Sequence, residues 1–283
     1  MIEVIKRSGE KEVFDEAKVR RSLKRSGANK TVEDKIVEKL IKKLYQGITT
    51  EKIYRLVFNW LKQEKVSLAS KYNLKQAIIK LGPTGYPFEL FLARLLEAYK
   101  FETKTSQVLS GKCVDHEVDV IAKTKGFDCL KQIDQPACYL IECKFHGVGG
   151  AKVVLKTALY VWARFWDLKE VKINYFGQED VFNQGLLATN TKITSQALKY
   201  CQCMNLAVLS WDYPKGNTLP ELIDKSHRHP LTCLNSLSTQ DQQALLSQGL
   251  VFCQDLLDKT SWQKLLGNKS QKIVAEAKAM IVD

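Results

Sequence analysis

The spacing of apolar positions predicts mostly helices before residue 82 and alternating strands and helices after it. Before it, short alternating runs at 3–7 and 11–14 predict two strands of a hairpin. A period near four residues then predicts helices over 16–25 and 31–45, from about 49 onward, and over 66–81. The first part of the chain is therefore expected to be a small, mostly helical domain with a hairpin at its start.

A segment rich in glycine and proline at 82–87 interrupts the helical pattern, and the predicted elements after it are of a different kind. Helices are predicted over 87–100, 151–168 and 193–204, and strands at roughly 105–122, 138–145, 171–175, 185–189 and 206–210. Alternating strands and helices indicate an α/β fold, a mixed sheet flanked by helices. Short helices are expected after it, which divides the chain into domains at 1–82, 83–217 and 218–283.

Composition limits the class of protein. Apolar residues make up 45% of the 283, enough for a buried core, yet no apolar run approaches the ~20 residues that span a bilayer. The first residues lack the apolar stretch of a signal peptide, so a cytoplasmic protein without a membrane partner is expected. The eight cysteines form no CxxC pair and are expected to be reduced. A zinc site at Cys201 and Cys203 is not expected, since neighbours two apart on a helix face different ways.

The net charge of +12 is unevenly distributed. Residues 1–82 hold 20 Lys and Arg against 10 Asp and Glu, whereas residues 83–283 hold 23 against 21. A basic surface attracts phosphates, and charge alone leaves open whether these belong to a free nucleotide or to DNA. The first domain is therefore the expected phosphate-binding part of the chain.

Charged residues interrupt two otherwise apolar strands. In the strand at 139–145, Glu142 and Lys144 share one face, and Asp119 interrupts the strand at 116–121. Burying charges without partners is costly, so these residues call for a ligand. If the strands pair, Asp119 and Glu142 converge, and Mg²⁺ or Mn²⁺ between them would relieve their repulsion. Lys144 beside them would orient the attacking water and stabilise a charged transition state.

A third acid opens the helix before the sheet. Glu89 interrupts its apolar face and is the predicted additional metal ligand, with Glu97, two turns on, as the substitute. The bland alternative is that Glu142 and Lys144 form an ordinary surface ion pair. The spacing from Asp119 and the apolar opposite face favour the catalytic interpretation.

This arrangement of Asp119, Glu142-x-Lys144 and Glu89 resembles the PD-(D/E)XK nucleases. Within that superfamily, residues 84–215 look most like the Mrr-type restriction endonuclease domain. The supporting segments are Phe88-Glu89, Val118-Asp119-Val120, Glu142-Cys143-Lys144, Leu187 to Thr194 and Ala197 to Tyr200. Val118 stands where the motif has proline, and Glu142 stands where many Mrr-type members carry glutamine. The resemblance implies a restriction-endonuclease-like fold and metal-dependent hydrolysis of DNA, with a role in restriction or phage defence.

A glycine-containing turn at 146–150 follows the Glu142 strand. Lys152 and Lys156 come next, one turn apart on the helix predicted there, and are the candidate contacts to the DNA backbone. Solvated lysines after a simple strand-to-helix turn remain the equal alternative.

The first domain resembles the ATP-cone domain, which regulates ribonucleotide reductases by binding ATP or dATP. The resemblance rests on Val4-Ile5-Lys6-Arg7-Ser8-Gly9, on Val13 to Arg20, on the helix from Ile53 to Gln63 and on the region of Tyr72. It implies phosphate contacts from Lys6, Arg7 and Lys18, with Val4 and Arg21 nearby. No GxxxxGK[ST] loop occurs, so hydrolysis of that class is not expected. The alternative is that this basic domain binds DNA.

Residues 234–257 resemble a single helix-hairpin-helix element, which would bring the backbone at Gly249 to a DNA phosphate. An ordinary helical hairpin is the alternative. The combined prediction is a homo-oligomeric, Mg²⁺- or Mn²⁺-dependent DNA endonuclease with an adenine nucleotide as effector. The rival hypothesis is a nucleotide-sensing DNA-binding regulator whose nuclease fold is inert.

Overall fold

A computed structural model describes residues 2–124, 126–130, 133–134, 136–258 and 260–281 of the chain. Its contacts divide the chain into two compact units. Unit 1 joins Met1–Ile78 to His229–Asp283, and unit 2 is Ile79–Arg228. The sheet-bearing part of the chain is thus inserted between two segments that fold together.

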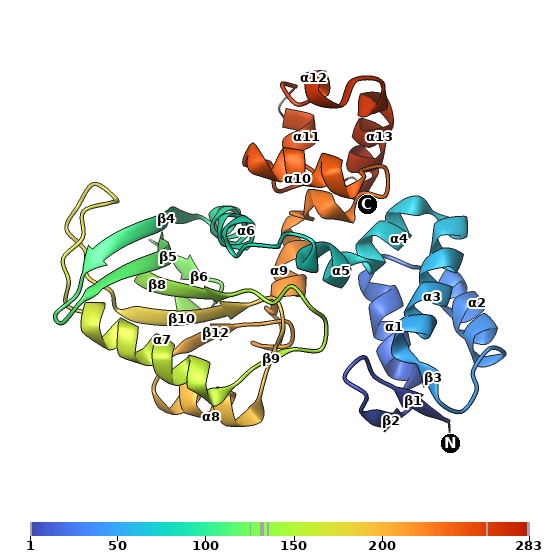
Figure 1. Cartoon of the computed structure of the whole chain (residues 1–283), viewed down its shortest axis with the longest axis horizontal. Coiled ribbons are helices and arrows are strands. Elements are labelled where there is room, and N and C mark those ends of the chain that lie inside the picture. The colour runs from blue at the N-terminus through green and yellow to red at the C-terminus, as the bar shows by residue number, and fades with distance from the viewer. Residues whose placement is uncertain (1, 125, 131–132, 135, 259, 282–283) are drawn as a thin grey trace. The chain divides into compact units, whose positions relative to one another are not determined.

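Unit 1 is mostly helical and carries a small three-stranded sheet (Figure 1). Its N-terminal elements are β1 (Glu3–Ile5), β2 (Lys11–Val13), α1 (Glu16–Arg25), α2 (Lys30–Ile41), β3 (Ile48–Thr49), α3 (Thr50–Glu64), α4 (Val66–Tyr72) and α5 (Leu74–Ile79). Its C-terminal elements are η1 (Leu231–Cys233), α10 (Thr239–Ser247), α11 (Asp255–Asp258), α12 (Gln263–Leu266), η2 (Gly267–Lys269) and α13 (Ser270–Ile281). The element α5 ends one residue past the boundary of the unit.

Local chemistry fixes where these helices begin. The Asp15 carboxylate accepts a hydrogen bond from Ala17 N, and Asn29 and Thr49 cap α2 and α3 in the same way. Leu23, Ile36 and Leu61 are fully buried in the core of this domain, as their helical spacing predicts. The predicted hairpin and first helices are confirmed, while the single helix predicted over 66–81 is divided into α4 and α5.

The C-terminal helices pack on the N-terminal ones within unit 1. Glu276 on α13 accepts hydrogen bonds from Ser70 Oγ of α4 at 3.2 Å, from Asn235 N at 2.8 Å and from Ser236 N at 2.9 Å. Because these bonds and the α4–α13 packing tie residues 229–283 to residues 1–78, the contacts do not follow the three predicted domains. Among the described residues, no helix combines the length and apolarity needed to cross a membrane.

Unit 2 is built on a mixed five-stranded sheet in the order β12-β10-β8-β5-β4. Its elements are α6 (Tyr86–Glu97), β4 (Phe101–Ser110), β5 (Asp115–Thr124), β6 (Phe127–Asp128), β7 (Ile133–Asp134), β8 (Ala137–Lys144), β9 (Lys152–Val153), α7 (Leu155–Leu168), β10 (Gln184–Thr189), β11 (Lys192–Ile193), α8 (Ser195–Cys203), β12 (Ala207–Leu209) and α9 (Leu219–Ser226). The strands β4, β5 and β8 pair antiparallel, whereas β8, β10 and β12 pair parallel. The predicted fold class, a mixed sheet flanked by helices, is confirmed.

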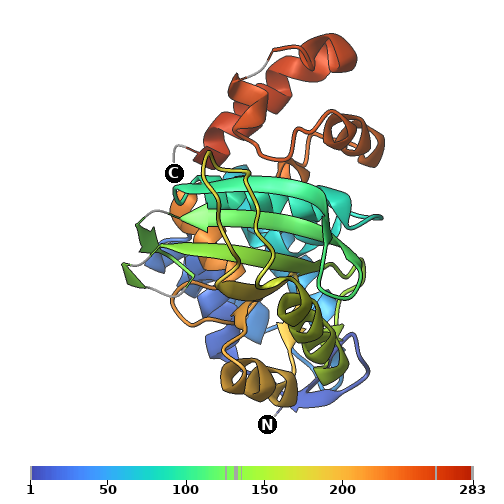
Figure 2. The same cartoon turned by 90° about the vertical axis from the view of Figure 1, so that its left-hand side faces the viewer.

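Helices cover both faces of this sheet. In Figures 1 and 2, α7 and α8 lie on the face opposite α6. Alternation along β8 sends Leu140 toward α7, where it packs with Phe165, and sends Tyr139 toward the other face, where its ring meets Phe101. The same alternation places Glu142 on the α7 face.

Several predicted boundaries in unit 2 are wrong. The stretch 105–122, for which strand was expected without a turn being placed, is a hairpin of β4 and β5, whose turn packs so tightly that a Cβ on Gly111 would lie 2.2 Å from Asp167 Oδ2. Residues 171–175, expected to be a strand, contain only the isolated bridge from Ile173 to Asp180 among the described residues. Residues 219–226, assigned to the C-terminal domain by sequence, form α9 of unit 2, where Tyr99 Oη bonds Leu222 O at 2.7 Å.

Candidate metal centre and nucleotide site

The strands β5 and β8 separate at the predicted site. Their ladder ends at Val120↔Ile141, and one more step of the same register would set Asp119 opposite Glu142. Instead, Asp119 Oδ2 accepts a hydrogen bond from Cys143 N at 2.7 Å, so a side chain replaces the next backbone acceptor. The two predicted acids therefore lie side by side where the sheet opens.

The other neighbour of Asp119 is also irregular. The ladder between β4 and β5 runs from Thr105↔Val120 to Gln107↔Val118 and omits Ser106, which stands opposite Asp119. Ser106 has φ of 54°, a left-handed conformation that residues other than glycine rarely adopt. Because both ladders are interrupted at Asp119, its carboxylate can accept the Cys143 N–H, which a regular strand would pair with a backbone carbonyl.

Glu142 has a partner that sequence analysis did not identify. Arg164 of α7 donates from Nη1 to Glu142 Oε2 and from Nη2 to the backbone oxygen of Glu117. Both side chains are largely buried, 9% exposed for Arg164 and 14% for Glu142. The clue in the sequence was an arginine on the apolar face of a helix, in line with Val161 and Leu168.

Glu89 reaches the same region from the first turn of α6. Burial raises the pKa of Glu89 to about 7, and the negative charges of Asp119 and Glu117 add to the shift. Burial likewise raises the pKa of Glu142 to about 7, helped by the charge of Asp119 and opposed by those of Arg164 and Lys144. The pKa of Asp119 is also raised, chiefly by burial. Asp119 is thus close enough to disfavour ionisation of both Glu89 and Glu142, and Glu89 adds to the effect on Glu142.

Lys144 is exposed and makes no hydrogen bond or ion pair with any residue that the structure describes. The alternative of a surface ion pair between Glu142 and Lys144 is therefore not what forms, since Glu142 pairs with Arg164. The backbone around the lysine is held in place. Thr189 Oγ1 donates to Lys144 O at 2.7 Å, and the Asn190 amide bonds both the N–H and the carbonyl of His146.

The acids suit a small divalent cation in donor type, although no three acidic, histidine or cysteine side chains in the described ranges are grouped closely enough to hold one by themselves. Mg²⁺ commonly takes one or two carboxylates and completes its shell with water. In the described structure, Asp119 Oδ1 and Glu142 Oε1 accept no hydrogen bond. Two open oxygens on adjacent carboxylates therefore fit the predicted ion. Glu97, the substitute ligand, instead accepts a bond from Thr103 Oγ1 at 2.6 Å.

The candidate DNA contacts lie on two different elements. Lys152 is on β9, opposite Lys192 of β11, and not on the helix where it was expected. Lys156 is exposed on the first turn of α7. The expected spacing of one helical turn between Lys152 and Lys156 is therefore wrong, because a short parallel strand pair precedes the helix.

Gly249 follows α10 with φ of 72°, as a left-handed turn after a helix requires. The N–H groups of Val251 and Phe252, just after it, both donate to Asp255 Oδ2, at 2.8 and 2.9 Å. These donors are occupied within the chain, so the contact of Gly249 with DNA stays a prediction.

Of the predicted nucleotide residues, Val4 and Lys18 line a cavity at the hairpin of unit 1, whereas Lys6, Arg7 and Arg21 do not. This cavity of about 160 Å³ is lined by Val4, Glu12, Phe14, Asp15, Lys18, Val19, Ser22, Thr50, Ile53 and Tyr72. Glu12, which sequence analysis did not single out, pairs with Lys6 at 2.9 Å and with Lys18 at 3.0 Å. Arg7 and Arg21 are exposed, and neither forms an ion pair with a described residue.

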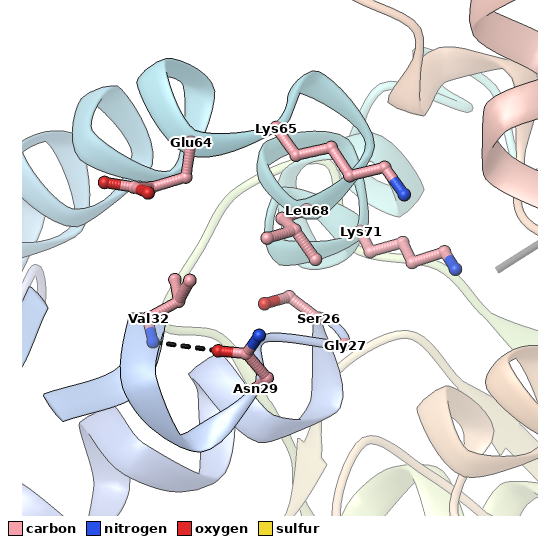
Figure 3. Close-up of a pocket in the computed structure, with 8 residues that line it drawn as sticks. All are labelled: Ser26, Gly27, Asn29, Val32, Glu64, Lys65, Leu68 and Lys71. Carbon is pink, nitrogen blue, oxygen red and sulfur yellow. Dashed lines mark hydrogen bonds between the residues drawn. The ribbon is translucent and has the colours of Figure 1, made fainter. Parts of the chain in front are cut away.

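A second hollow of unit 1, about 430 Å³, contains none of the predicted nucleotide residues. It is lined by Ser26, Gly27, Asn29, Val32, Glu64, Lys65, Leu68 and Lys71 (Figure 3). Asn29 caps α2 there by accepting from Val32 N at 3.0 Å. Lys65 and Lys71 both have other partners in the chain, so the hollow is not a ready anion site.

Comparison with known proteins gives two family matches. The ATP cone domain family matches residues 2–77, which confirms the predicted N-terminal domain, and the family described as AF1548-like, C-terminal, matches residues 229–281. An "Uncharacterized protein" of Archaeoglobus fulgidus is 34% identical over 194 residues, covering 67% of this chain and 99% of that protein. A match of this length necessarily includes residues of unit 2.

Two solved structures are similar. The "Protein of Unknown Function AF1548" has 33% identity and a TM-score of 0.56, covering 70% of this chain and 98% of that one. The restriction endonuclease MspJI in complex with a 27-mer oligonucleotide has 16% identity and a TM-score of 0.36, covering 74% of this chain and 39% of that one. A likeness as slight as the second carries no argument about this chain.

Proposed function

Because the chain belongs to the AF1548-like family and begins with an ATP-cone domain, we propose that it is a nucleotide-regulated, metal-dependent DNA endonuclease. The observation that carries the proposal is the group of Glu89, Asp119 and Glu142 beside Lys144, which pairs with no described residue, where β5 and β8 separate. Carboxylates held together against their own repulsion, next to an exposed amine, are typical of sites that bind a cation and an anionic substrate.

Asp119 and Glu142 would hold Mg²⁺ or Mn²⁺ through their open oxygens, and Glu89 would reach it directly or through water. The cation would supply an activated water and neutralise charge that develops on the phosphate. The exposed Lys144 ammonium would orient that water and stabilise the transition state. Lys152 and Lys156 are exposed and would contact the DNA backbone, each at its own place.

In unit 1, ATP or dATP would bind at the hairpin cavity beside Val4 and Lys18. Lys6 and Lys18 would exchange their ion pairs with Glu12 for ion pairs with the phosphates of the nucleotide. The phosphates would also contact the exposed Arg7 and Arg21. Regulation requires the nucleotide to bind one state of the protein more tightly than another, and a homo-oligomer is one form that such a state can take.

The test is cleavage of supercoiled plasmid by the full chain with Mg²⁺ or Mn²⁺, with and without ATP or dATP. Asp119→Asn keeps an oxygen for the Cys143 N–H but removes the charge, and should abolish cleavage. Asp115→Asn, an exposed acid on the same strand, should cleave like the wild type. Cleavage that survives Asp119→Asn would contradict the assigned site.

A second candidate function is a DNA-binding regulator with an inert nuclease fold. The observation that favours it is the ion pair of Glu142 with Arg164, which already neutralises one of the acids. DNA binding without cleavage under every combination of metal and nucleotide would support this candidate against the first.

A further inference from the structure

Arg164 lies at the centre of the acidic group, although it comes from a helix outside the sheet. Its guanidinium bridges the Glu142 carboxylate of β8 and the Glu117 carbonyl of β5, the two strands that separate there. The ring of Tyr160, one turn earlier on α7, lies 5.4 Å from the guanidinium carbon. Arginine stays charged in any protein environment, so this positive charge is permanent.

The guanidinium is incompletely satisfied in this position. Its Nε atom is buried and has no hydrogen-bond partner among the described residues. A buried donor without an acceptor costs free energy, which lowers the gain from holding Arg164 there. Glu142 is in turn the carboxylate that the proposed function needs for a cation, so arginine and metal share one ligand.

We propose that Arg164 is an internal counter-ion that competes with the divalent cation for Glu142. This inference rests on the proposed function, in which Glu142 is a metal ligand. Without metal, the guanidinium limits the repulsion between Glu142 and Asp119 and keeps the site assembled. When the cation binds, Glu142 gives up this partner or shares it, and the protein binds metal more weakly than the acids alone would.

The test measures Mn²⁺ affinity of the full chain, without DNA or nucleotide, from the electron paramagnetic resonance signal of free Mn²⁺. Arg164→Met removes the charge and keeps an apolar chain of similar reach, and should tighten Mn²⁺ binding about tenfold, the scale of a charge interaction in a half-buried site. Arg164→Lys keeps the charge but cannot bridge two acceptors, and should tighten binding about threefold. A merely structural arginine would leave the affinity unchanged or weaken it.

Lys123→Met is the matched control, because Lys123 is a buried cation of the same sheet that pairs with Asp180. It should lower stability without changing Mn²⁺ affinity, and circular dichroism checks that each variant is folded. If Arg164→Met fails to fold, Arg164→Lys carries the test.

The controls separate this inference from the proposed function. If Asp119→Asn weakens Mn²⁺ binding while both Arg164 variants leave it unchanged, the counter-ion role is wrong and the metal site stands. If the wild type binds no Mn²⁺ at millimolar concentration, the proposed metal site fails and the counter-ion role fails with it.

Discussion

The two candidate sites differ in how far their clustered charges are paired within the chain. In the hairpin of unit 1, Lys18 pairs with Glu12 and Lys6 pairs with both Glu10 and Glu12, so these two lysines are already balanced by acids of the chain. In unit 2, three acids with raised pKa values gather beside Lys144, which has no ion-pair partner in the described structure, and only Glu142 has a buried counter-ion. One site is balanced without its ligand, and the other is not.

The difference predicts how each site responds to its ligand. A nucleotide at the hairpin must first break ion pairs, which costs part of the free energy that its phosphates gain. A cation at the acids competes with Arg164 for Glu142, but it also relieves the repulsion among carboxylates that have no such partner. Binding of the cation should therefore stabilise the folded protein.

The largest expected effect is on the unbalanced site. Lys144→Met should lower the cleavage rate on the order of a hundredfold, because the amine acts on the reacting groups, while leaving Mn²⁺ affinity within about twofold. Single-turnover cleavage and Mn²⁺ titration measure the two quantities. Lys152→Met, which removes an exposed lysine from β9, should change the rate much less. Equal rates for both variants would contradict the special role of Lys144.

A smaller effect is expected at the balanced site. Lys18→Gln should weaken ATP binding about tenfold, the loss of one charge-assisted contact. Glu12→Gln should strengthen it about threefold, since Lys6 and Lys18 are then released. Calorimetric titration of the full chain measures both, with Lys62→Gln as an exposed lysine control near the far end of α3. Weaker binding by Glu12→Gln would break the comparison between the two sites.

A still smaller effect is expected from the hydrogen bond that holds the backbone at Lys144. Thr189→Val removes the hydrogen bond to Lys144 O and should destabilise the protein by about 1 kcal/mol, with a several-fold loss of cleavage. Urea denaturation measures the first effect. Thr103→Val, which loses an exposed bond to Glu97, should cost less than about 0.5 kcal/mol. A matching loss in the two variants would remove the support assigned to Thr189.

The smallest effect is a dependence of stability on pH. Glu142 has a pKa of about 7 when folded and near 4.5 when unfolded, so the folded protein holds its proton more tightly. Its contribution to stability is therefore full below about pH 4.5 and is lost as the pH rises to 7. Urea denaturation without metal should show the wild type losing up to about 1 kcal/mol more than Glu142→Gln between pH 5 and 8, after allowance for solvent screening.

Two observations guard this last measurement. The pKa of His146 is lowered by burial, which acts in the opposite sense, but both proteins carry this residue and the difference cancels it. At the hairpin, the hydrogen bond from Lys6 lowers the pKa of Glu12, so its contribution is present above pH 4.5 and is lost as the pH falls. Identical pH profiles for wild type and Glu142→Gln would show that folding does not raise the pKa of Glu142.

The sequence predicted the meeting of Asp119, Glu142 and Glu89 because strand alternation and helix position are local properties. Arg164 was missed because its role depends on which strand α7 covers, and periodicity records only that position 164 faces inward. The turn between β4 and β5 was also not located, since Gly111 has no proline beside it and lies between two polar stretches. Its tightness comes from Asp167, more than fifty residues later.

The packing of residues 229–283 on residues 1–78 could likewise not be predicted from local sequence patterns. Glu276 carries the contact between α13 and α4, yet in the sequence it is one acid on an amphipathic helix. Its partners Ser70 and Asn235 are ordinary polar residues whose meeting requires the whole unit to be folded. The predicted domain boundaries followed changes in composition, whereas the compact units follow these distant bonds.

The insertion of unit 2 between the two segments of unit 1 has a mechanical consequence. The chain crosses between the units twice, near residues 78 and 228, so they are joined by two covalent tethers. Both ends of unit 2 therefore continue into segments that fold together in unit 1, and a cut at one crossing would leave the units joined through the other. A rearrangement of the helices in unit 1 would thus pull on both ends of the inserted domain at once.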